Sequence, residues 1–164
     1  MYARLQSALA QLPLDHLPPR VLNVGCGEYP SAHILAEALP RWTLYGVDID
    51  GDALRRADQS VLHLIQADAR CLPLRASFGL VLIRHPDLYR SYTAWAQIMP
   101  SLVAHLAPDG LLLITLYAPE EVELIRALSL PPVYALDGLA SADFAGHDRY
   151  VLAYRVPNSS RTTA

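Results

Sequence analysis

Short runs of apolar residues alternate along this chain with longer stretches in which apolar and polar residues mix. The runs are rich in Val, Ile, Leu and Tyr and are bounded by Gly, Pro and Asp, a pattern typical of buried strands. They predict strands at residues 21–24, 42–47, 61–66, 78–83, 111–116 and 150–156, and a weaker strand at 133–136. The mixed stretches predict helices at residues 2–12, 32–39, 91–106 and 119–128, and a short helix through Leu54 and Ala57. Strands that alternate with helices indicate a parallel sheet with helices on both faces.

Polar residues and prolines predict details at the ends of these elements. Ser31 can cap the helix that follows it, and either Asp50 or Asp52 can cap the short helix after the second strand. Because proline lacks the amide that a helix interior needs, the long fourth helix is expected to bend at Pro100. The Asp109-Gly110 pair is expected to turn the chain into the fifth strand.

The length and composition predict a single folded domain. The chain has 164 residues, of which 52% are hydrophobic and 18% are charged, so it can bury a substantial core. No internal repeat or long linker divides the sequence. We therefore expect residues 1–157 to form one domain, with residues 1–20 as an N-terminal helix and lead-in. We expect the polar tail at 158–164 to be disordered.

Charge, apolar runs and cysteine content indicate which partners and which compartment to expect. The net charge is −3 and the 13 Lys and Arg residues are scattered, so nucleic acid is disfavoured as a partner. No signal peptide is apparent, and the strongest apolar run, residues 111–117, is too short to cross a bilayer. Cys26 and Cys71 lie far apart in a chain with a good core, which favours a reducing compartment. We therefore expect a cytoplasmic protein that does not enter a membrane.

Two glycines and an acidic residue follow the first two predicted strands. Gly25 and Gly27 come directly after the first strand, where glycine lets the backbone approach a ligand and the next helix offers free N–H groups. Asp48 ends the second strand about twenty residues further on, where a carboxylate can accept hydrogen bonds from both hydroxyls of a ribose. Together these residues favour a nucleotide-like ligand. The alternative is that the glycines form a tight turn and that Asp48 caps a helix.

Five segments of the chain form an ordered set, residues 21–27, 44–49, 65–74, 77–83 and 106–114. In this order they resemble the first three motifs, the strand leading into the fourth motif, and the helix-to-strand turn of the fifth motif of the class I S-adenosylmethionine-dependent methyltransferases. The resemblance implies an α/β fold with a doubly wound, Rossmann-like sheet, mostly parallel with an antiparallel last strand. It also implies S-adenosylmethionine as the cofactor and methyl transfer to an unidentified acceptor, which we expect to be a small molecule.

The same resemblance assigns cofactor-binding roles to residues near the ends of the predicted strands. Gly25 and Gly27 would approach the methionine end of the cofactor. Asp48 would hold the ribose, Ile49 would pack on the adenine, and Asp68 would accept a hydrogen bond from the adenine amino group. The full cofactor-binding set is Asn23, Gly25, Cys26, Gly27, Asp48, Ile49, Asp68, Ala69 and Arg84.

Two residues depart from the family pattern. Asn23 stands where the family often has an acid, so we expect a weaker grip on the amino group of the cofactor. Tyr29 stands where a third glycine is common, so we expect its ring to crowd the site or to form an aromatic wall beside the ligand.

The segment 84–89 is predicted to hold the catalytic residues, because substrates meet the cofactor at the carboxyl ends of the strands. His85 could take a proton from an attacking hydroxyl or amine, and Asp87 could orient His85 or hold a cationic substrate. The alternative is that Asp87 caps a helix and His85 is only solvated. The segment lacks the Asn/Asp-Pro-Pro-Tyr/Phe form of many amino-group methyltransferases, which weakens the case for methylation of a nucleic-acid base.

Other ligands and roles fit the sequence less well. A nicotinamide-binding Gly-x-Gly-x-x-Gly turn would need glycine at Pro30. A calcium loop beginning at Asp48 would need Gly at Ala53 and Glu at Gln59. The histidines show no metal-ligand spacing, so no metal is expected. Because the core uses nearly the whole chain, a non-catalytic methyltransferase-like partner protein remains an alternative, and so does a homodimer or a protein partner that completes the acceptor site.

Overall fold

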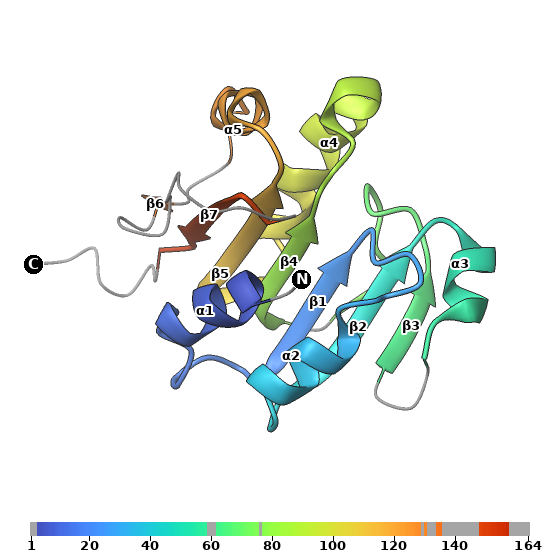
Figure 1. Cartoon of the computed structure of the whole chain (residues 1–164), viewed down its shortest axis with the longest axis vertical. Coiled ribbons are helices and arrows are strands. Elements are labelled where there is room, and N and C mark those ends of the chain that lie inside the picture. Colours follow the sequence, from blue (N-terminus) through green and yellow to red (C-terminus); the bar gives the residue numbers. More distant parts are fainter. Residues whose placement is uncertain are drawn as a thin grey trace, which may run out of the picture.

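The computed structural model describes residues 3–58, 62–75, 77–128, 130, 134–135 and 148–157, so the predicted tail at 158–164 lies outside the described residues. Within this part of the chain, seven strands form one sheet in the order β3-β2-β1-β4-β5-β7-β6 (Figure 1). The strands are β1 (Arg20–Val24), β2 (Thr43–Asp48), β3 (Leu62–Gln66), β4 (Phe78–Arg84), β5 (Leu106–Leu116), β6 (Tyr134–Ala135) and β7 (Tyr150–Arg155). Strands β1 to β5 pair in parallel, and β7 pairs antiparallel with β5 and β6. The predicted doubly wound, mostly parallel sheet with an antiparallel last strand is confirmed.

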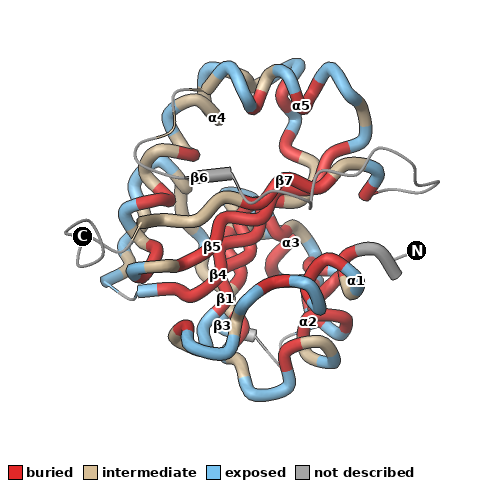
Figure 2. The backbone as a smooth tube through the Cα atoms, turned by 90° about the vertical axis from the view of Figure 1, so that its left-hand side faces the viewer, coloured by how far each residue is buried: buried red, intermediate tan, exposed pale blue. Residues whose placement is uncertain are grey.

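Helices cover both faces of the sheet. They are α1 (Ala3–Gln11), α2 (Ala32–Ala38), α3 (Gly51–Arg56), α4 (Leu88–Val103) and α5 (Pro119–Arg126). Helices α1 and α2 lie on one face, and α4 and α5 lie on the other (Figure 2). Leu54 places α3 in the same core as α1 and α2. None of the helices in the described ranges has both the length and the apolar character needed to cross a bilayer.

Each face of the sheet has its own apolar core. In β1, Val21 packs in the core beneath α1 and α2, whereas Leu22 and Val24 pack in the core beneath α4 and α5. The central strands are buried along most of their length, as the red tube in Figure 2 shows. Strands that are covered on both faces need apolar residues at every position, which explains their unbroken apolar runs in the sequence. Polar residues are therefore concentrated at the strand ends.

Helix α4 begins three residues before its predicted start. Asp87 caps it by accepting a hydrogen bond from the Arg90 amide (3.2 Å), and this cap allows the helix to begin at Leu88. The non-helical backbone inside α4 lies at Ser91 (φ −128°, ψ 27°) and not at Pro100, where the bend was predicted. Ser91 therefore separates the capped first turn from the rest of the helix.

The helix caps at α2 and α3 differ from each other. Ser31 occupies the N-cap position of α2, but its side chain makes no capping hydrogen bond, so the predicted Ser31 cap is wrong. Ser31 is also buried, because α2 packs closely on the core. At α3 the cap is Asp50, whose Oδ1 accepts from the amides of Asp52 (2.9 Å) and Ala53 (3.1 Å). The structure thus decides between Asp50 and Asp52.

Strand β5 also begins earlier than predicted. Leu106 already pairs with Phe78 of β4, and the register then shifts between Phe78 and Leu80. Asp109 adopts a positive φ of 62° within this irregular part of the strand. Asp109 and Gly110 therefore form an irregularity inside β5 and not a turn before it.

Candidate active site

The loop between β1 and α2 is shaped by two glycines with positive φ, Gly25 at 67° and Gly27 at 54°. The amides of Gly25 and Cys26 donate to the Val47 carbonyl at 2.8 and 3.1 Å, which holds the loop against the end of β2. A Cβ atom at Gly25 would lie 3.7 Å from Trp95 of α4. Apart from Gly27 and its two chain neighbours, no described residue has an atom within 4 Å of the Cβ position at Gly27, so the backbone there faces open space into which a ligand can fit.

Asp48 connects this loop to the end of β2. Its Oδ2 accepts from the Gly27 amide at 2.7 Å, and its Oδ1 accepts from the Asp50 amide at 2.8 Å. Each carboxylate oxygen can accept a further hydrogen bond, so the side chain can still bind two neighbouring hydroxyls. Ile49, directly after it, is 69% exposed and offers an apolar surface next to the carboxylate. The structure therefore brings Gly27, Asp48 and Ile49 to one place.

Asn23 and Tyr29 lie beneath the glycine loop. Asn23 is 2% exposed, and its Oδ1 has no hydrogen-bond partner among the described residues, while its side chain hydrogen-bonds the Tyr29 hydroxyl. Tyr29 is also 2% exposed, and burial raises the pKa of its hydroxyl. Its ring packs so closely on Gly46 that a Cβ atom there would lie 2.9 Å from it.

The prediction that Tyr29 would crowd the ligand or form a wall beside it is wrong, because the ring fills the core below the loop. The sequence does carry a signal for this position. Gly46 interrupts an otherwise bulky strand, and a glycine inside a strand often marks a close approach by another group. That group is the ring of Tyr29 together with the Cys26 sulfur, which would also lie 2.9 Å from a Cβ atom at position 46.

Asp68 follows β3 and is held by Arg70. The Arg70 amide donates to Asp68 Oδ1 (2.9 Å), and the guanidinium Nε lies 3.0 and 2.9 Å from the two carboxylate oxygens. These hydrogen bonds lower the pKa of Asp68 to about 2, so the carboxylate stays ionised. The next residue, Ala69, accepts a hydrogen bond from the Ser101 hydroxyl of α4 (3.1 Å). An adenine amino group would therefore compete with Arg70 for Asp68.

A buried charged cluster lies at the carboxyl ends of β4 and β5. The Asp148 side chain is fully buried, and its Oδ1 lies 3.1 Å from Arg84 Nη2 and 3.0 Å from His85 Nε2. Neither ring nitrogen of His85 has a well-aligned hydrogen-bond partner in the described ranges. His85 has a positive φ of 49°, and its ring stacks on Tyr117 with centroids 3.7 Å apart. Such a backbone conformation is costly for a non-glycine residue and is held here by its surroundings.

Asp148 is ionised in this cluster. Burial alone would raise the pKa of its carboxyl, but the contact with His85 and the positive charge of Arg84 together lower it to about 2. Arg84, which was assigned to the cofactor, therefore gives its guanidinium to Asp148. Asp87 does not pair with His85 and instead caps α4.

Asp148, which precedes β7 and lies 64 residues from Arg84, was not predicted from the sequence. A usable signal exists in the topology. An antiparallel strand begins at the edge where the parallel strands end, and Tyr150 at the start of β7 pairs with Leu116 at the end of β5. An acidic residue just before such a strand therefore lies at the sheet edge that holds the candidate site. Trp95, beside Gly25, was also missed.

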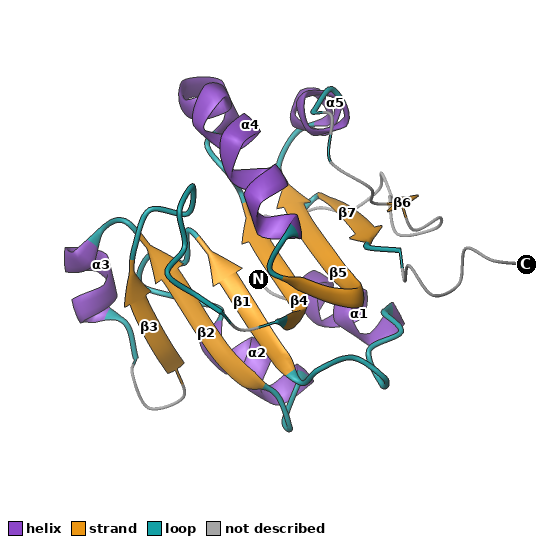
Figure 3. Ribbon diagram, turned by 180° about the vertical axis from the view of Figure 1, so that it is seen from behind, coloured by secondary structure: helices purple, strands orange, loops and turns teal. Residues whose placement is uncertain are grey.

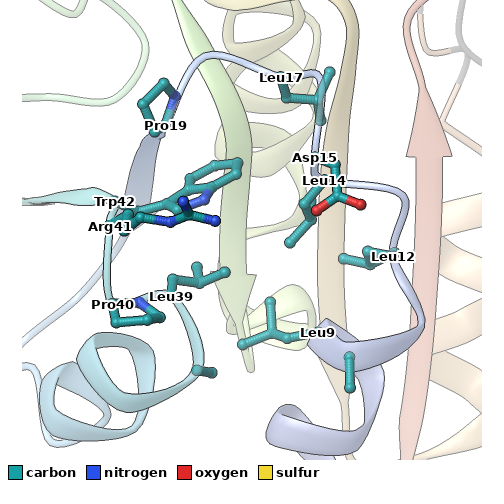
Figure 4. A pocket seen from close by; sticks show the side chains of 12 residues that line it. Leu9, Leu12, Leu14, Asp15, Leu17, Pro19, Leu39, Pro40, Arg41 and Trp42 are labelled. Carbon is teal, nitrogen blue, oxygen red and sulfur yellow. The ribbon is translucent and has the colours of Figure 1, made fainter.

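A hollow of about 600 Å³ lies elsewhere on the molecule (Figure 4). Leu9, Leu12, Leu39, Arg41 and Trp42 are among the residues that line it. It adjoins the amino ends of β1 and β2, whereas Gly27 and Asp48 follow their carboxyl ends. The hollow is therefore separate from the candidate active site, and we assign it no part in cofactor binding.

Comparison with known proteins decides the family. A family profile described as "Methyltransferase domain" matches residues 21–110, which is more than half of the chain. The chain belongs to this methyltransferase family. The match covers the glycine loop, Asp48, Asp68 and the segment 84–89, so the resemblance read from the motifs is confirmed.

Individual relatives agree with this membership. Trans-aconitate 2-methyltransferase from Azoarcus sp. (strain BH72) is 32% identical over 108 residues, which are 65% of this chain and 42% of that protein. The chain thus spans about two fifths of the length of the curated relatives that it matches.

Solved structures show the same methyltransferase fold. The S-adenosylmethionine-dependent methyltransferase SibL superposes with a TM-score of 0.68 at 17% identity, covering 95% of this chain and 55% of SibL. The N-methyltransferase NodS from Bradyrhizobium japonicum WM9 gives 0.63 at 19% identity, with 94% of this chain and 96% of NodS covered. A second NodS structure holds S-adenosyl-L-homocysteine.

Proposed function

We propose that this chain binds S-adenosylmethionine and transfers its methyl group to a small-molecule acceptor. The observation that carries the proposal is the arrangement of Gly27, Asp48 and Ile49. An open backbone position, a carboxylate anchored to it at 2.7 Å and an exposed apolar side chain lie together at the ends of β1 and β2. Family membership and the printed names of SibL and of the NodS complex support the same cofactor.

The residues present fit this cofactor. The unpartnered, buried Oδ1 of Asn23 is suited to accept a hydrogen bond from an ammonium group, which would supply the partner that this atom lacks. Asp48 would hold the ribose hydroxyls, and Ile49 would cover one face of the adenine. Asp68 and Ala69 would receive the adenine edge, with Asp68 giving up part of its contact with Arg70. Cys26 contributes its backbone only, because burial raises the pKa of its thiol to about 12.

The chain's own contribution to the reaction is mainly orientation. When bound, the cofactor supplies a methyl group on a positively charged sulfur, which is electrophilic without an acid catalyst. The acceptor must therefore be held in line with this methyl group, and such positioning can account for a large part of a rate enhancement. His85 would receive the proton that the acceptor loses, and the exposed Asp87 would face a cationic acceptor.

Thermal unfolding with three separate ligands tests the cofactor. Ligand at about 100 times its Kd stabilises the folded protein by roughly 2.7 kcal/mol, which is several degrees for a chain of this size. We expect S-adenosylmethionine and S-adenosylhomocysteine to raise the Tm and NADH to leave it unchanged. A rise with NADH alone, or no rise with either sulfur ligand in folded, ligand-free protein, would contradict the proposal.

A binding protein without catalytic activity is the second candidate. It is favoured by the burial of both ring nitrogens of His85. Formation of S-adenosylhomocysteine in the presence of an acceptor separates the two roles. Two acceptors should be assayed: trans-aconitate, which relatives that are about 30% identical carry in their names, and tyramine, an aromatic amine without carboxylates. We also propose a cytoplasmic location, which the free thiols of Cys26 and Cys71 support. The homodimer or protein partner stays a prediction.

A further inference from the structure

The exposed large apolar side chains of the described residues gather at one edge of the sheet. They are Ile49 (69% exposed), Tyr89 (65%) and Tyr117 (46%). Ile49 follows β2, Tyr89 lies in the first turn of α4 after β4, and Tyr117 follows β5. The arrowheads of these parallel strands point to the same edge of the sheet (Figure 3). Exposed apolar groups that share one edge indicate a binding surface.

Tyr89 and Tyr117 lie near a common neighbour, Glu121 at the start of α5. Burial raises the pKa of both phenols, and the negative charge of Glu121 contributes a further increase to each. Glu121 itself is fixed, because its Oε2 accepts from the amides of Tyr117 (2.7 Å) and Ala118 (3.0 Å). Tyr117 therefore lies directly before α5, and Tyr89, which follows the neighbouring strand β4, is close enough for the charge of Glu121 to act on both phenols.

Tyr117 is held as a rigid wall. One face of its ring stacks on His85 at 3.7 Å with an angle of 19° between the ring planes. His85 is in turn packed against the buried Asp148. With its backbone amide bound by Glu121 and its ring stacked, Tyr117 presents the exposed remainder of its surface in a defined orientation.

This aromatic pair lies at the same edge of the sheet as the proposed cofactor site. From β2, where Ile49 lies, to β5, where Tyr117 lies, the sheet crosses β1 and β4. Three strand spacings correspond to about 14 Å. A cofactor that covers the ends of β2 and β1 would leave the ends of β4 and β5, and hence the two tyrosines, for the acceptor.

The charges around the pair do not favour a polyanionic acceptor. The acidic residues Asp87, Glu120, Glu121 and Asp148 lie at these strand and helix ends. Three arginines lie at the same ends and are outnumbered by these acids: Arg84 pairs with Asp148, Arg149 lies over the Tyr150 ring (5.9 Å to its centroid), and Arg90 follows Tyr89 in α4. Recognition of a carboxylate cluster needs several cations with free donors. Aromatic faces beside acidic groups suit flat neutral rings or cations instead.

We propose that Tyr89 and Tyr117 form the acceptor subsite and that it takes a planar aromatic acceptor, neutral or cationic, without a cluster of carboxylates. This inference rests on the proposed function and specifies its substrate class. Tyr117 forms the fixed wall and the more exposed Tyr89 forms the adjustable one.

Saturation-transfer NMR titrations with tyramine and with trans-aconitate test the subsite, both in the presence of S-adenosylhomocysteine. We expect tyramine to bind and trans-aconitate not to bind. Tyr89→Ala and Tyr117→Ala each remove one stacking ring and should weaken the affinity for tyramine about two- to tenfold. Tyr89→Phe and Tyr117→Phe keep the ring and should bind tyramine as the unaltered protein does.

Thermal shifts with S-adenosylhomocysteine on the same samples separate this inference from the proposed function. If that ligand binds and tyramine does not, or if trans-aconitate binds equally well to both alanine variants, the aromatic subsite is wrong and the cofactor proposal stands. If tyramine binds equally to all four variants, the subsite is also wrong. If S-adenosylhomocysteine does not bind, both proposals fail together.

Discussion

The Gly27 amide donates a 2.7 Å hydrogen bond to Asp48 Oδ2, so the loop after β1 is fixed to the end of β2 before any ligand arrives. The same carboxylate accepts from the Asp50 amide through its other oxygen. Asp48 therefore has two roles, because it shapes the loop and also presents acceptors for the ribose of the proposed cofactor. A loop that is ordered in advance loses less conformational entropy when a ligand binds.

Replacement of Asp48 should strongly weaken binding of the cofactor. Hydrogen bonds to charged groups contribute about 1.5–3 kcal/mol each, so Asp48→Ala should raise the Kd for S-adenosylhomocysteine by about tenfold to a hundredfold. Isothermal titration calorimetry measures this. Asp52→Ala is the matched control, because Asp52 is an exposed acid paired with Arg55 on the neighbouring helix. An equal loss in both variants would show that Asp48 acts only through general stability or charge.

Removal of Arg70 should strengthen cofactor binding. Arg70 occupies both oxygens of Asp68, and water weakens an exposed ion pair of this kind, so an adenine amino group could replace Arg70 readily. We expect Arg70→Ala to lower the Kd for S-adenosylhomocysteine up to about fivefold. Arg55→Ala, which breaks the ion pair with Asp52, should leave the Kd unchanged. Weaker binding in Arg70→Ala would instead mean that Arg70 itself contacts the ligand.

Asp148 should make the protein sensitive to acid. Its pKa of about 2 in the folded chain lies below the ordinary value of 3.8, so the unfolded state binds a proton more readily. The stabilisation is complete above about pH 4 and is lost as the pH falls towards 2, amounting to about 2 kcal/mol of unfolding free energy.

Urea unfolding at a series of pH values checks this contribution. Asp148→Asn should be less stable than the unaltered protein at pH 6, because Arg84 then loses its buried partner. It should also show a smaller decline in unfolding free energy between pH 4 and 2. Parallel declines in the two proteins would assign the acid sensitivity to other carboxylates.

Gly46 should not tolerate a side chain. A Cβ atom there would lie 2.9 Å from both the Cys26 sulfur and the Tyr29 ring, so Gly46→Ala should cost about 1–3 kcal/mol of stability through overpacking. Thermal unfolding measures the loss. In the Tyr29→Ala background the additional cost of Gly46→Ala should be smaller, because half of the clash is gone. Strict additivity of the two substitutions would contradict the packing of Tyr29 on Gly46.

The parts of the site that could be predicted are those fixed by local backbone geometry. Gly25, Gly27 and Asp48 follow strands whose apolar runs are unmistakable, and the carboxyl ends of parallel strands must share an edge. Their positions follow from the topology alone. The residues that the sequence placed wrongly depend on packing. Tyr29 belongs to the same loop. Its ring packs into the core because Gly46 has no side chain and leaves room for it.

The pairing of Asp148 with Arg84 could not be predicted from spacing along the sequence. Arg84 lies 64 residues away, and the order β4-β5-β7 decides that they meet. Asp87 is a similar case at shorter range. The sequence allowed it either to act in the site or to cap a helix, and only its contact with the Arg90 amide shows that it caps α4.

The antiparallel direction of β7 has a consequence for the order in which the protein is assembled during synthesis. Everything that forms the cofactor half, from β1 to β3, has left the ribosome long before residue 148 emerges. The acceptor half cannot be completed at that stage, because Asp148, which pairs with Arg84 and contacts His85, has not yet been synthesised. A nascent chain could therefore hold its nucleotide-like ligand early, but it would become competent to receive an acceptor only when its last strand docks.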